Sequence, residues 1–342
     1  MKLSLLLVLL LGCLAGTPTA VQAYEGRTAT LAKTHAAPTV KRKATVKRKV
    51  AVKRKAVAKR RLAPKRKVVL VHKRRVHKPA ALLVASAPRA ARLAALKSSA
   101  VLILDPQTRK VLYQKNADAV MPIASLTKLM TAMVVLEAQQ SMTEQLTIAD
   151  IDVDRLKYSS SRLRVGTRLP RASMLHLALM SSENRAASAL GRHYPGGTRA
   201  FVAAMNAKAQ ALGMRSTRYV EPTGLSSANV STPEDLARLV IAAERHPLIR
   251  RYSTDREFTI RQGTQPTVYH NSNRLTASRS WQIRMQKTGY ISEAGRCMVL
   301  HASVRGRPTV MVFLDSQGTL SRAADANRVR AWLASVNPWA HS

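Results

Sequence analysis

The sequence predicts an α+β fold, with about five strands in one mainly antiparallel sheet, flanking helices and a helical subdomain. Two observations support this fold class. Apolar, strand-like runs gather at the two ends of the segment 100–315, two near its start and three near its end. Between them, residues 124–256 mostly carry apolar side chains at helical spacing. The helical segment is therefore expected to form an insert beside a sheet built from both ends of the segment.

The five strands are predicted from apolar runs that flank turn sequences. AVLILD and KVLYQK surround the proline-containing turn PQTR and predict a hairpin at residues 100–115. CMVLHASV and TVMVFLD predict a second hairpin at residues 297–315. The run WQIRMQKTG, which begins at Trp281, alternates with a period of two and predicts the remaining strand.

Helices are predicted where apolar residues recur three and four positions apart. This spacing occurs in SLTKLMTAMVVLEAQ (125–139), in RASMLHLALMSSENRAASALGRHY (171–194) and in SRAADANRVRAWLASV (321–336). Another helix is predicted after Thr232, because threonine is a good N-cap and Pro233 suits the first helical position.

The charge of the 342-residue chain divides it into unlike parts. The formal net charge is +39, and residues 26–104 contain no Asp or Glu, whereas residues 27–97 contain 24 Lys and Arg. From residue 98 onward, 32 basic residues face 17 acidic ones. We therefore predict three parts: a leader at 1–23, a basic and disordered linker at 24–97, and a catalytic domain at 98–338.

The first residues, MKLSLLLVLLLGCLAGTPTAVQA, have the pattern of a secretory signal peptide with cleavage after Ala23. The apolar run is too short to span a bilayer. The alternatives are an N-terminal core helix and a lipoprotein signal, in which LLGC would make Cys13 a lipid-anchored residue. Cleavage after Ala23 predicts an exported, periplasmic protein. Cys297 would then be its one cysteine, with packing as its expected role.

The basic linker contains triplets that begin every six residues, at Lys41, Lys47, Lys53, Lys59 and Lys65. No aromatic residue lies between Tyr24 and Tyr113, so the tract lacks the stacking side chains that bind single-stranded nucleic acid. In an exported protein, nucleic acid is not the expected partner. The tract is expected to bind anionic envelope polymers by counterion release. It indicates where the protein adheres, but no reaction.

Chemistry is first suggested by Ser125-Leu-Thr-Lys128 at a predicted helix start. Backbone N–H groups at that end favour developing negative charge near Ser125. Lys128 lies one turn later on the same face and could remove the serine proton if it were neutral. Burial and a second cation nearby would both lower its pKa. The alternative is a capping serine with a surface lysine.

Two further triplets suggest a substrate site. In Ser182-Glu183-Asn184, the serine could relay a proton and the asparagine could hold a substrate amide. In Lys287-Thr288-Gly289, the first two side chains could bind a carboxylate, and the glycine allows a substrate backbone to approach closely. The alternatives are a polar helix end and a strand end with a turn glycine.

The order of these three motifs resembles that of penicillin-binding proteins and β-lactamases. PIASLTKLMTAMVVLEA, LALMSSENRAASAL, EPTGLSSANVST and KTGYISEAG make residues 100–336 similar to a low-molecular-mass penicillin-binding protein. The D-alanyl-D-alanine endopeptidase branch is favoured, because Glu183 stands where the related carboxypeptidases usually have glycine. This resemblance implies a β-lactamase/transpeptidase-like fold, peptidoglycan peptides as substrates and β-lactams as covalent inhibitors.

The resemblance also implies roles for individual residues. Ser125 would be the acylated nucleophile and Lys128 its general base, kept neutral beside Lys287. Ser182 would pass a proton to the leaving amine.

Substrate would be positioned by Asn184, and Lys287 and Thr288 would supply charge and hydrogen bonds beside Gly289. The backbone N–H groups of Ser125 and Tyr290 would form an oxyanion hole.

Three hypotheses compete at this point. The first is an endopeptidase that cleaves D-alanyl cross-links of peptidoglycan. The second is a D-alanyl-D-alanine carboxypeptidase or a β-lactamase on the same fold. The third is a non-enzymatic polyanion-binding protein with a vestigial site. No cofactor or metal is expected, and His176, His193 and His270 are interpreted as structural or surface residues.

Overall fold

The computed structural model describes residues 91–336. The predicted signal peptide, Cys13 and residues 24–90 of the basic linker lie outside this range. The last seven linker residues, 91–97, were predicted to be disordered, and this is wrong: a short helix forms at Ala91–Ala94, and Leu93 and Leu96 are buried in the core. Within it, no helix is both long and apolar enough to cross a membrane.

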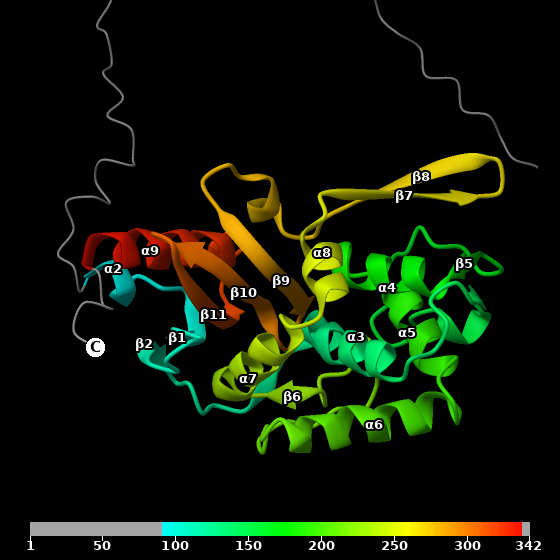
Figure 1. The fold of residues 1–342 in the computed structure, drawn as a ribbon, viewed down its shortest axis with the longest axis horizontal. Coiled ribbons are helices and arrows are strands. Elements are labelled where there is room, and N and C mark those ends of the chain that lie inside the picture. Colours follow the sequence, from blue (N-terminus) through cyan, green and yellow to red (C-terminus); the bar gives the residue numbers. More distant parts are fainter. Residues whose placement is uncertain (1–90, 337–342) are drawn as a thin grey trace, which may run out of the picture. The chain divides into compact units, whose positions relative to one another are not determined.

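One five-stranded antiparallel sheet forms the centre of the domain, in the order β2-β1-β11-β10-β9 (Figure 1). Its strands are β1 (Ser98–Leu104), β2 (Val111–Lys115), β9 (Gln282–Ile291), β10 (Gly295–Val304) and β11 (Arg307–Ser316). The first strand pairs with β2 on one side and with β11 on the other. The predicted fold class and all five predicted strands are confirmed, and β9 lies at an edge of the sheet.

The two faces of the sheet are covered by different helices. On one face, Val101 and Phe313 pack with Val329 of α9 (Ser321–Val336), beside the short α2 (Ala91–Ala94). On the other face, Leu102 and Leu314 belong to the core that includes α7 (Pro233–Ala243). Successive residues of a strand point to opposite faces, so both faces are apolar and the central strands read as continuous apolar runs.

The helical subdomain surrounds a central helix, α3. Its helices are α3 (Thr127–Glu137), α4 (Arg171–Met180), α5 (Asn184–Arg192), α6 (Gly197–Ala211) and α8 (Pro247–Thr254). Residues 127–135 of α3 are all buried. A helix that is buried on every side is enclosed by other elements of the fold. The 3-10 turn that precedes it, Ala124–Leu126, is therefore held in a fixed position.

The segment 171–194, predicted as one helical run, is two helices that break at residues 181–183. Ser182 has a φ of 64°, a left-handed conformation that cannot continue an α-helix. Glu183 then caps α5 by accepting a hydrogen bond from Arg185 N. The predicted cap at Thr232 is confirmed, since its hydroxyl accepts from Asp235 N at 3.1 Å.

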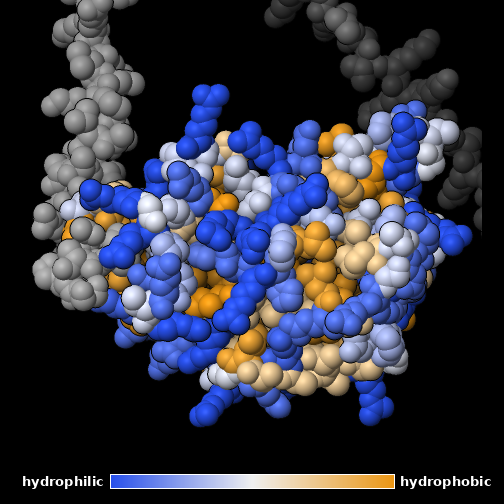
Figure 2. Space-filling model, in the orientation of Figure 1, coloured by the Kyte–Doolittle hydropathy of each residue, from blue (hydrophilic) through white to orange (hydrophobic). Residues whose placement is uncertain are grey.

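Several short elements lack a counterpart in the sequence prediction. They are β3 (Met121–Pro122) with β6 (Val230–Ser231), β4 (Gln145–Thr147) with β5 (Arg168–Pro170), β7 (Glu257–Gln262) with β8 (Gln265–His270), and the 3-10 turns η1 (Ala124–Leu126), η2 (Asp150–Asp152) and η3 (Arg274–Ala277). The β7–β8 hairpin extends beyond the central sheet (Figure 1). Hydrophilic side chains project over much of the face in Figure 2, with apolar residues showing between them.

Candidate active site

Ser125 lies in η1, immediately before α3. The backbones of two glycines from other parts of the chain approach it closely. Gly224 has a φ of +82°, and a Cβ there would come within 2.0 Å of the Ala124 carbonyl oxygen. A Cβ at Gly289 of β9 would lie 2.9 Å from Ser125 N. Both glycines are thus needed for the backbone to approach the serine this closely.

Lys128 is fully buried one turn into the helix, and three oxygen atoms surround its amine. Its Nζ lies 2.8 Å from Ser125 Oγ, 2.7 Å from Asn184 Oδ1 and 2.6 Å from the Thr223 carbonyl oxygen. Amide and carbonyl oxygens can only accept hydrogen bonds. A neutral amine would donate its two N–H groups to Asn184 and Thr223, which leaves the nitrogen lone pair for the serine hydroxyl.

Burial lowers the pKa of Lys128 to about 8, although the carboxylates of Glu221, Glu183 and Asp154 act in the opposite direction. An appreciable fraction of the amine is therefore neutral near pH 7, as a general base requires.

Lys287 of β9 is also fully buried, and its Nζ donates to Ser182 Oγ at 2.8 Å and to the Thr288 carbonyl at 2.8 Å. Burial, together with the positive charges of Lys128 and Arg322, holds the pKa of Lys287 well below its usual range. The positive charge of Lys128 thus contributes to lowering the pKa of Lys287, whereas burial is the influence that lowers the pKa of Lys128.

The remaining predicted residues lie around two hydrogen-bonded pairs, Ser125 with Lys128 and Ser182 with Lys287. Asn184 begins α5 and donates through Nδ2 to Ser159 Oγ at 2.9 Å. Thr288 shares a 2.8 Å hydrogen bond with the Ser272 hydroxyl. Tyr290 follows Gly289 on β9, and its side chain is exposed. The structure thus brings the three predicted motifs together: Asn184 contacts Lys128, Ser182 contacts Lys287, and Gly289 lies beside Ser125.

Several residues in contact with the site were not predicted, among them Thr223, Ser159, Ser272 and Arg322. Arg322 of α9 donates to the Gly289 carbonyl at 2.8 Å and to the Cys297 carbonyl at 3.2 Å, which fixes this part of β9. The run EPTGLSSANVST carried a signal for Thr223, because Pro222 and Gly224 on either side of it favour a turn. The other three have no local motif.

Two glutamates near Lys128 already hold structural hydrogen bonds. Glu221 accepts from Thr223 N and Gly224 N, both at 2.6 Å, and so shapes the turn that contacts Ser125. Glu183 accepts from Ser161 Oγ at 2.6 Å. Both carboxylates therefore stabilise segments beside the site, and among the described residues neither one hydrogen-bonds to Ser125 Oγ.

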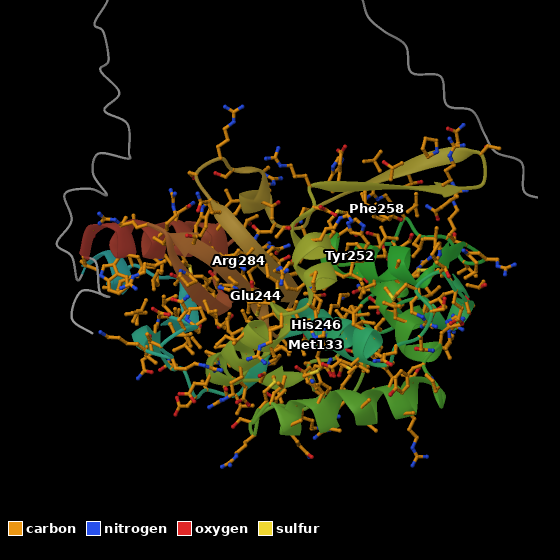
Figure 3. The ribbon with its side chains drawn as sticks, in the orientation of Figure 1. Met133, Glu244, His246, Tyr252, Phe258 and Arg284 are labelled. Carbon is orange, nitrogen blue, oxygen red and sulfur yellow. The ribbon has the colours of Figure 1, made fainter. Side chains whose placement is uncertain are left out.

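The histidines considered above have partners outside the site. His176 stacks on Tyr252 and packs at a tilt against Phe258, with ring centroids 4.3 Å and 4.1 Å away. Figure 3 labels these two aromatic partners. His193 Nδ1 lies 2.8 Å from the Ala189 carbonyl, and His270 is exposed on β8. Within residues 91–336, no group of three His, Cys, Asp or Glu side chains is placed to hold a metal ion.

Comparison with known proteins identifies the family that the three motifs resemble. Residues 84–318 match the family model described as D-alanyl-D-alanine carboxypeptidase. The chain is 49% identical over 240 residues to a D-alanyl-D-alanine endopeptidase of Pseudomonas aeruginosa, covering 70% of this chain and 77% of that one. It is 45% identical over 260 residues to the D-alanyl-D-alanine endopeptidase of Escherichia coli, covering 75% and 82%.

Solved structures also resemble the chain. The DD-transpeptidase of Streptomyces K15 is 28% identical, with a TM-score of 0.65, over 69% of this chain and 97% of that one. Penicillin-binding protein D2 of Listeria monocytogenes, solved in an ampicillin-bound form, is 30% identical with a TM-score of 0.60 over the same shares.

Proposed function

Because this chain belongs to the D-alanyl-D-alanine carboxypeptidase family of serine peptidases, we propose that it is an endopeptidase that hydrolyses D-alanyl cross-links of peptidoglycan. The observation that carries this proposal is the buried Lys128 amine 2.8 Å from Ser125 Oγ. The endopeptidase names of the two relatives and the presence of Glu183 favour cross-links over terminal residues as the substrate.

Acylation begins when Ser125 Oγ attacks the carbonyl carbon of the D-alanyl residue. The hydroxyl proton moves to the lone pair of Lys128 as the O–C bond forms. The negative charge then develops on the carbonyl oxygen, and the N–H groups of Ser125 and Tyr290 stabilise it. In studied enzymes, loss of one such donor costs about 3–4 kcal/mol of barrier.

The C–N bond breaks when the leaving nitrogen receives a proton. Ser182 donates its hydroxyl proton to that nitrogen. The proton that Lys128 took from Ser125 then returns by way of Lys287 and restores the Ser182 hydroxyl. Lys287 orients the Ser182 hydroxyl for this step through its 2.8 Å hydrogen bond. Water then attacks the Ser125 ester, and the reversed proton path regenerates the free serine.

Substrate is positioned by groups that line the approach to Ser125. Asn184 retains a second N–H for a substrate carbonyl. Thr288 supplies a hydroxyl, and a substrate carboxylate beside Lys287 would raise the pKa of its amine and favour the charged form. Gly289 lets the substrate backbone lie along β9.

Covalent trapping tests the serine mechanism. Labelled penicillin should acylate Ser125 and remain attached, because among the described residues Ser125 Oγ hydrogen-bonds to Lys128 and to no carboxylate that could activate water there. Intact-mass spectrometry should show one adduct in the wild-type protein and in Ser160→Ala, an exposed serine with no role in the site. Absence of the adduct, or its presence in Ser125→Ala, would refute the mechanism.

Product analysis decides between the endopeptidase and the carboxypeptidase. The protein is incubated separately with cross-linked muropeptide dimers and with monomeric pentapeptides, and the products are weighed by mass spectrometry. An endopeptidase converts dimers to monomers faster than it releases terminal D-alanine. Faster release of D-alanine from pentapeptides would favour the alternative.

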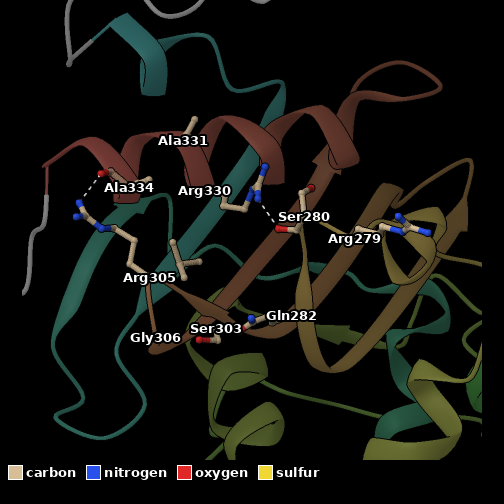
Figure 4. A pocket seen from close by; sticks show the side chains of 10 residues that line it. Arg279, Ser280, Gln282, Ser303, Arg305, Gly306, Arg330, Ala331 and Ala334 are labelled. Carbon is tan, nitrogen blue, oxygen red and sulfur yellow. Dashed lines mark hydrogen bonds between the residues drawn. The ribbon is translucent and has the colours of Figure 1, made fainter.

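The proposal also covers residues outside the described range. We propose that residues 1–23 direct export to the periplasm, with the lipid anchor at Cys13 as the less favoured alternative, and that the basic linker before residue 91 binds anionic envelope polymers. The described domain adds cationic surface of its own. Arg279, Arg305 and Arg330 line a pocket of about 390 Å³ beside α9, and none of its lining residues is acidic (Figure 4).

A further inference from the structure

The segment that follows η2 contains three successive serines with different surroundings. Ser159 Oγ accepts from Asn184 Nδ2 at 2.9 Å, and Ser161 Oγ donates to Glu183 at 2.6 Å. Ser160 between them is exposed. Ser159 and Ser161 thus attach this segment to the motif Ser182-Glu183-Asn184. Ser160 provides a matched control for substitutions of its neighbours.

The direction of the hydrogen bond between Ser159 and Asn184 follows from Asp154. The Asp154 carboxylate accepts from Ser159 Oγ at 2.5 Å and from Ser159 N at 2.9 Å, and the N–H groups of Leu156 and Lys157 donate to it as well, both at 2.9 Å. An ionised carboxylate only accepts, and a serine hydroxyl has one proton. That proton is used on Asp154, so Ser159 Oγ can only accept from Asn184.

Asn184 must therefore turn its NH₂ group toward Ser159 and its carbonyl oxygen toward Lys128, as observed at 2.7 Å. In the flipped orientation, the NH₂ group would donate to the Lys128 lone pair. That lone pair would then be unavailable to Ser125.

We propose that Ser159 and Asp154 are positioning residues that fix the orientation of the Asn184 amide and thereby keep Lys128 available as the base. This inference rests on the proposed function and adds two residues to its machinery. Neither residue needs to touch the substrate.

Asp154 has a second, separable effect, through its charge. The charged and titratable groups around Lys128 are Glu221, Glu183, Asp154 and Lys287, and each of the three carboxylates raises the pKa of the lysine. Replacing Asp154 by Asn removes one negative charge. The pH at which acylation reaches half of its maximum should then fall.

The experiment measures the rate of acylation by a fluorescent penicillin between pH 5.5 and 9.5. Ser160→Ala should behave as wild type. Ser159→Ala should acylate about 10- to 100-fold more slowly at every pH, since a misoriented catalytic group costs this order of rate. Ser159→Thr retains the hydroxyl and should recover most of the rate. Asp154→Asn should be slower at high pH, with its midpoint shifted to lower pH.

Urea unfolding of each variant accompanies the kinetics. The proposal is overturned if Ser159→Ala matches Ser160→Ala, or if a folded Ser159→Thr is as slow as Ser159→Ala. It is also overturned if Asp154→Asn acylates at the wild-type rate at high pH. If Ser159→Ala does not fold, Ser159→Thr and Asp154→Asn decide by the same criteria. Failure of the wild-type protein to form any adduct would instead refute the proposed function.

Discussion

Lys128 has to be buried and still titrate near neutral pH. Its amine is enclosed by Ser125, Asn184 and Thr223, and its pKa of about 8 is a compromise between burial and three carboxylates. A fully desolvated lysine without these carboxylates would have a lower pKa and would be a weaker base.

Changing Lys128 to Arg should lower the rate of penicillin acylation by about 10²- to 10⁴-fold, the usual contribution of a general base. A guanidinium group stays protonated in proteins and cannot accept the Ser125 proton. Lys208→Arg, on α6 and paired with Glu137, is the matched control and should acylate normally. Near-normal acylation by a folded Lys128→Arg variant would remove this lysine from the mechanism.

The rate of acylation should rise with pH and level off above the pKa of Lys128, which is about 8. The neutral amine is the active form, so below that pH each unit of acidification should slow acylation about tenfold. Stopped-flow measurements with a fluorescent penicillin test this directly. A rate that stays constant from pH 6 to 9, or that falls as the pH rises, would contradict the assignment.

The sequence predicted the residues of the site whose motifs are local. Ser125 and Lys128 are one helical turn apart, and their proximity follows from helix geometry. Thr223 contributes a backbone carbonyl, which any residue type could supply, and Ser159 acts through hydrogen bonds to Asp154 and Asn184. Such contacts depend on the tertiary fold and leave no spacing to detect in one sequence.

At the scale of elements, the turn containing Gly224 holds η1 in place. Its backbone passes so close to Ala124 that a side chain at Gly224 has no room. The Glu221 carboxylate stabilises the turn by accepting a hydrogen bond from Gly224 N. The position of the nucleophile therefore depends on a segment that contributes no catalytic side chain.

Gly224→Ala should abolish acylation and destabilise the domain by about 4 kcal/mol or more, because strain and steric overlap combine. Gly263→Ala is the matched control. It also has a positive φ, of +69°, but no atom lies within 4 Å of the added Cβ. It should cost only the left-handed strain, about 1–2 kcal/mol. Urea unfolding measures both, and equal losses would show that steric contact at Gly224 is unimportant.

The main strands were predictable because their apolar runs are long and flanked by turns, and the α7 cap followed from Thr232 and Pro233. The β7–β8 hairpin was missed for a physical reason. Ile260 and Tyr269 are its buried side chains, and Pro266 argues against a strand. The break between α4 and α5 was also missed, since Ser182 adopts its left-handed backbone inside an otherwise helical pattern.

For the whole molecule, deleting residues 40–78 should leave penicillin acylation nearly unchanged, because all three motifs lie beyond residue 98. The deletion should reduce co-sedimentation with isolated cell wall at low salt. High salt should remove this difference, since the binding depends on many exposed charges. If a cooperatively melting deletion variant no longer acylated, the basic tract would belong to the catalytic machinery.

The position of β1 inside the sheet bears on when the chain can fold. β1 is flanked by β2 and β11, so one of its edges stays unpaired until residues 307–316 have been synthesised. The carboxylate of Asp325 on α9 then receives hydrogen bonds from the N–H groups of Lys97 and Ser98, which ties together the two ends of the domain. Contacts this distant in sequence make folding slow and late. The nascent chain consequently cannot complete its sheet until its last strand is present, which suits the export proposed above.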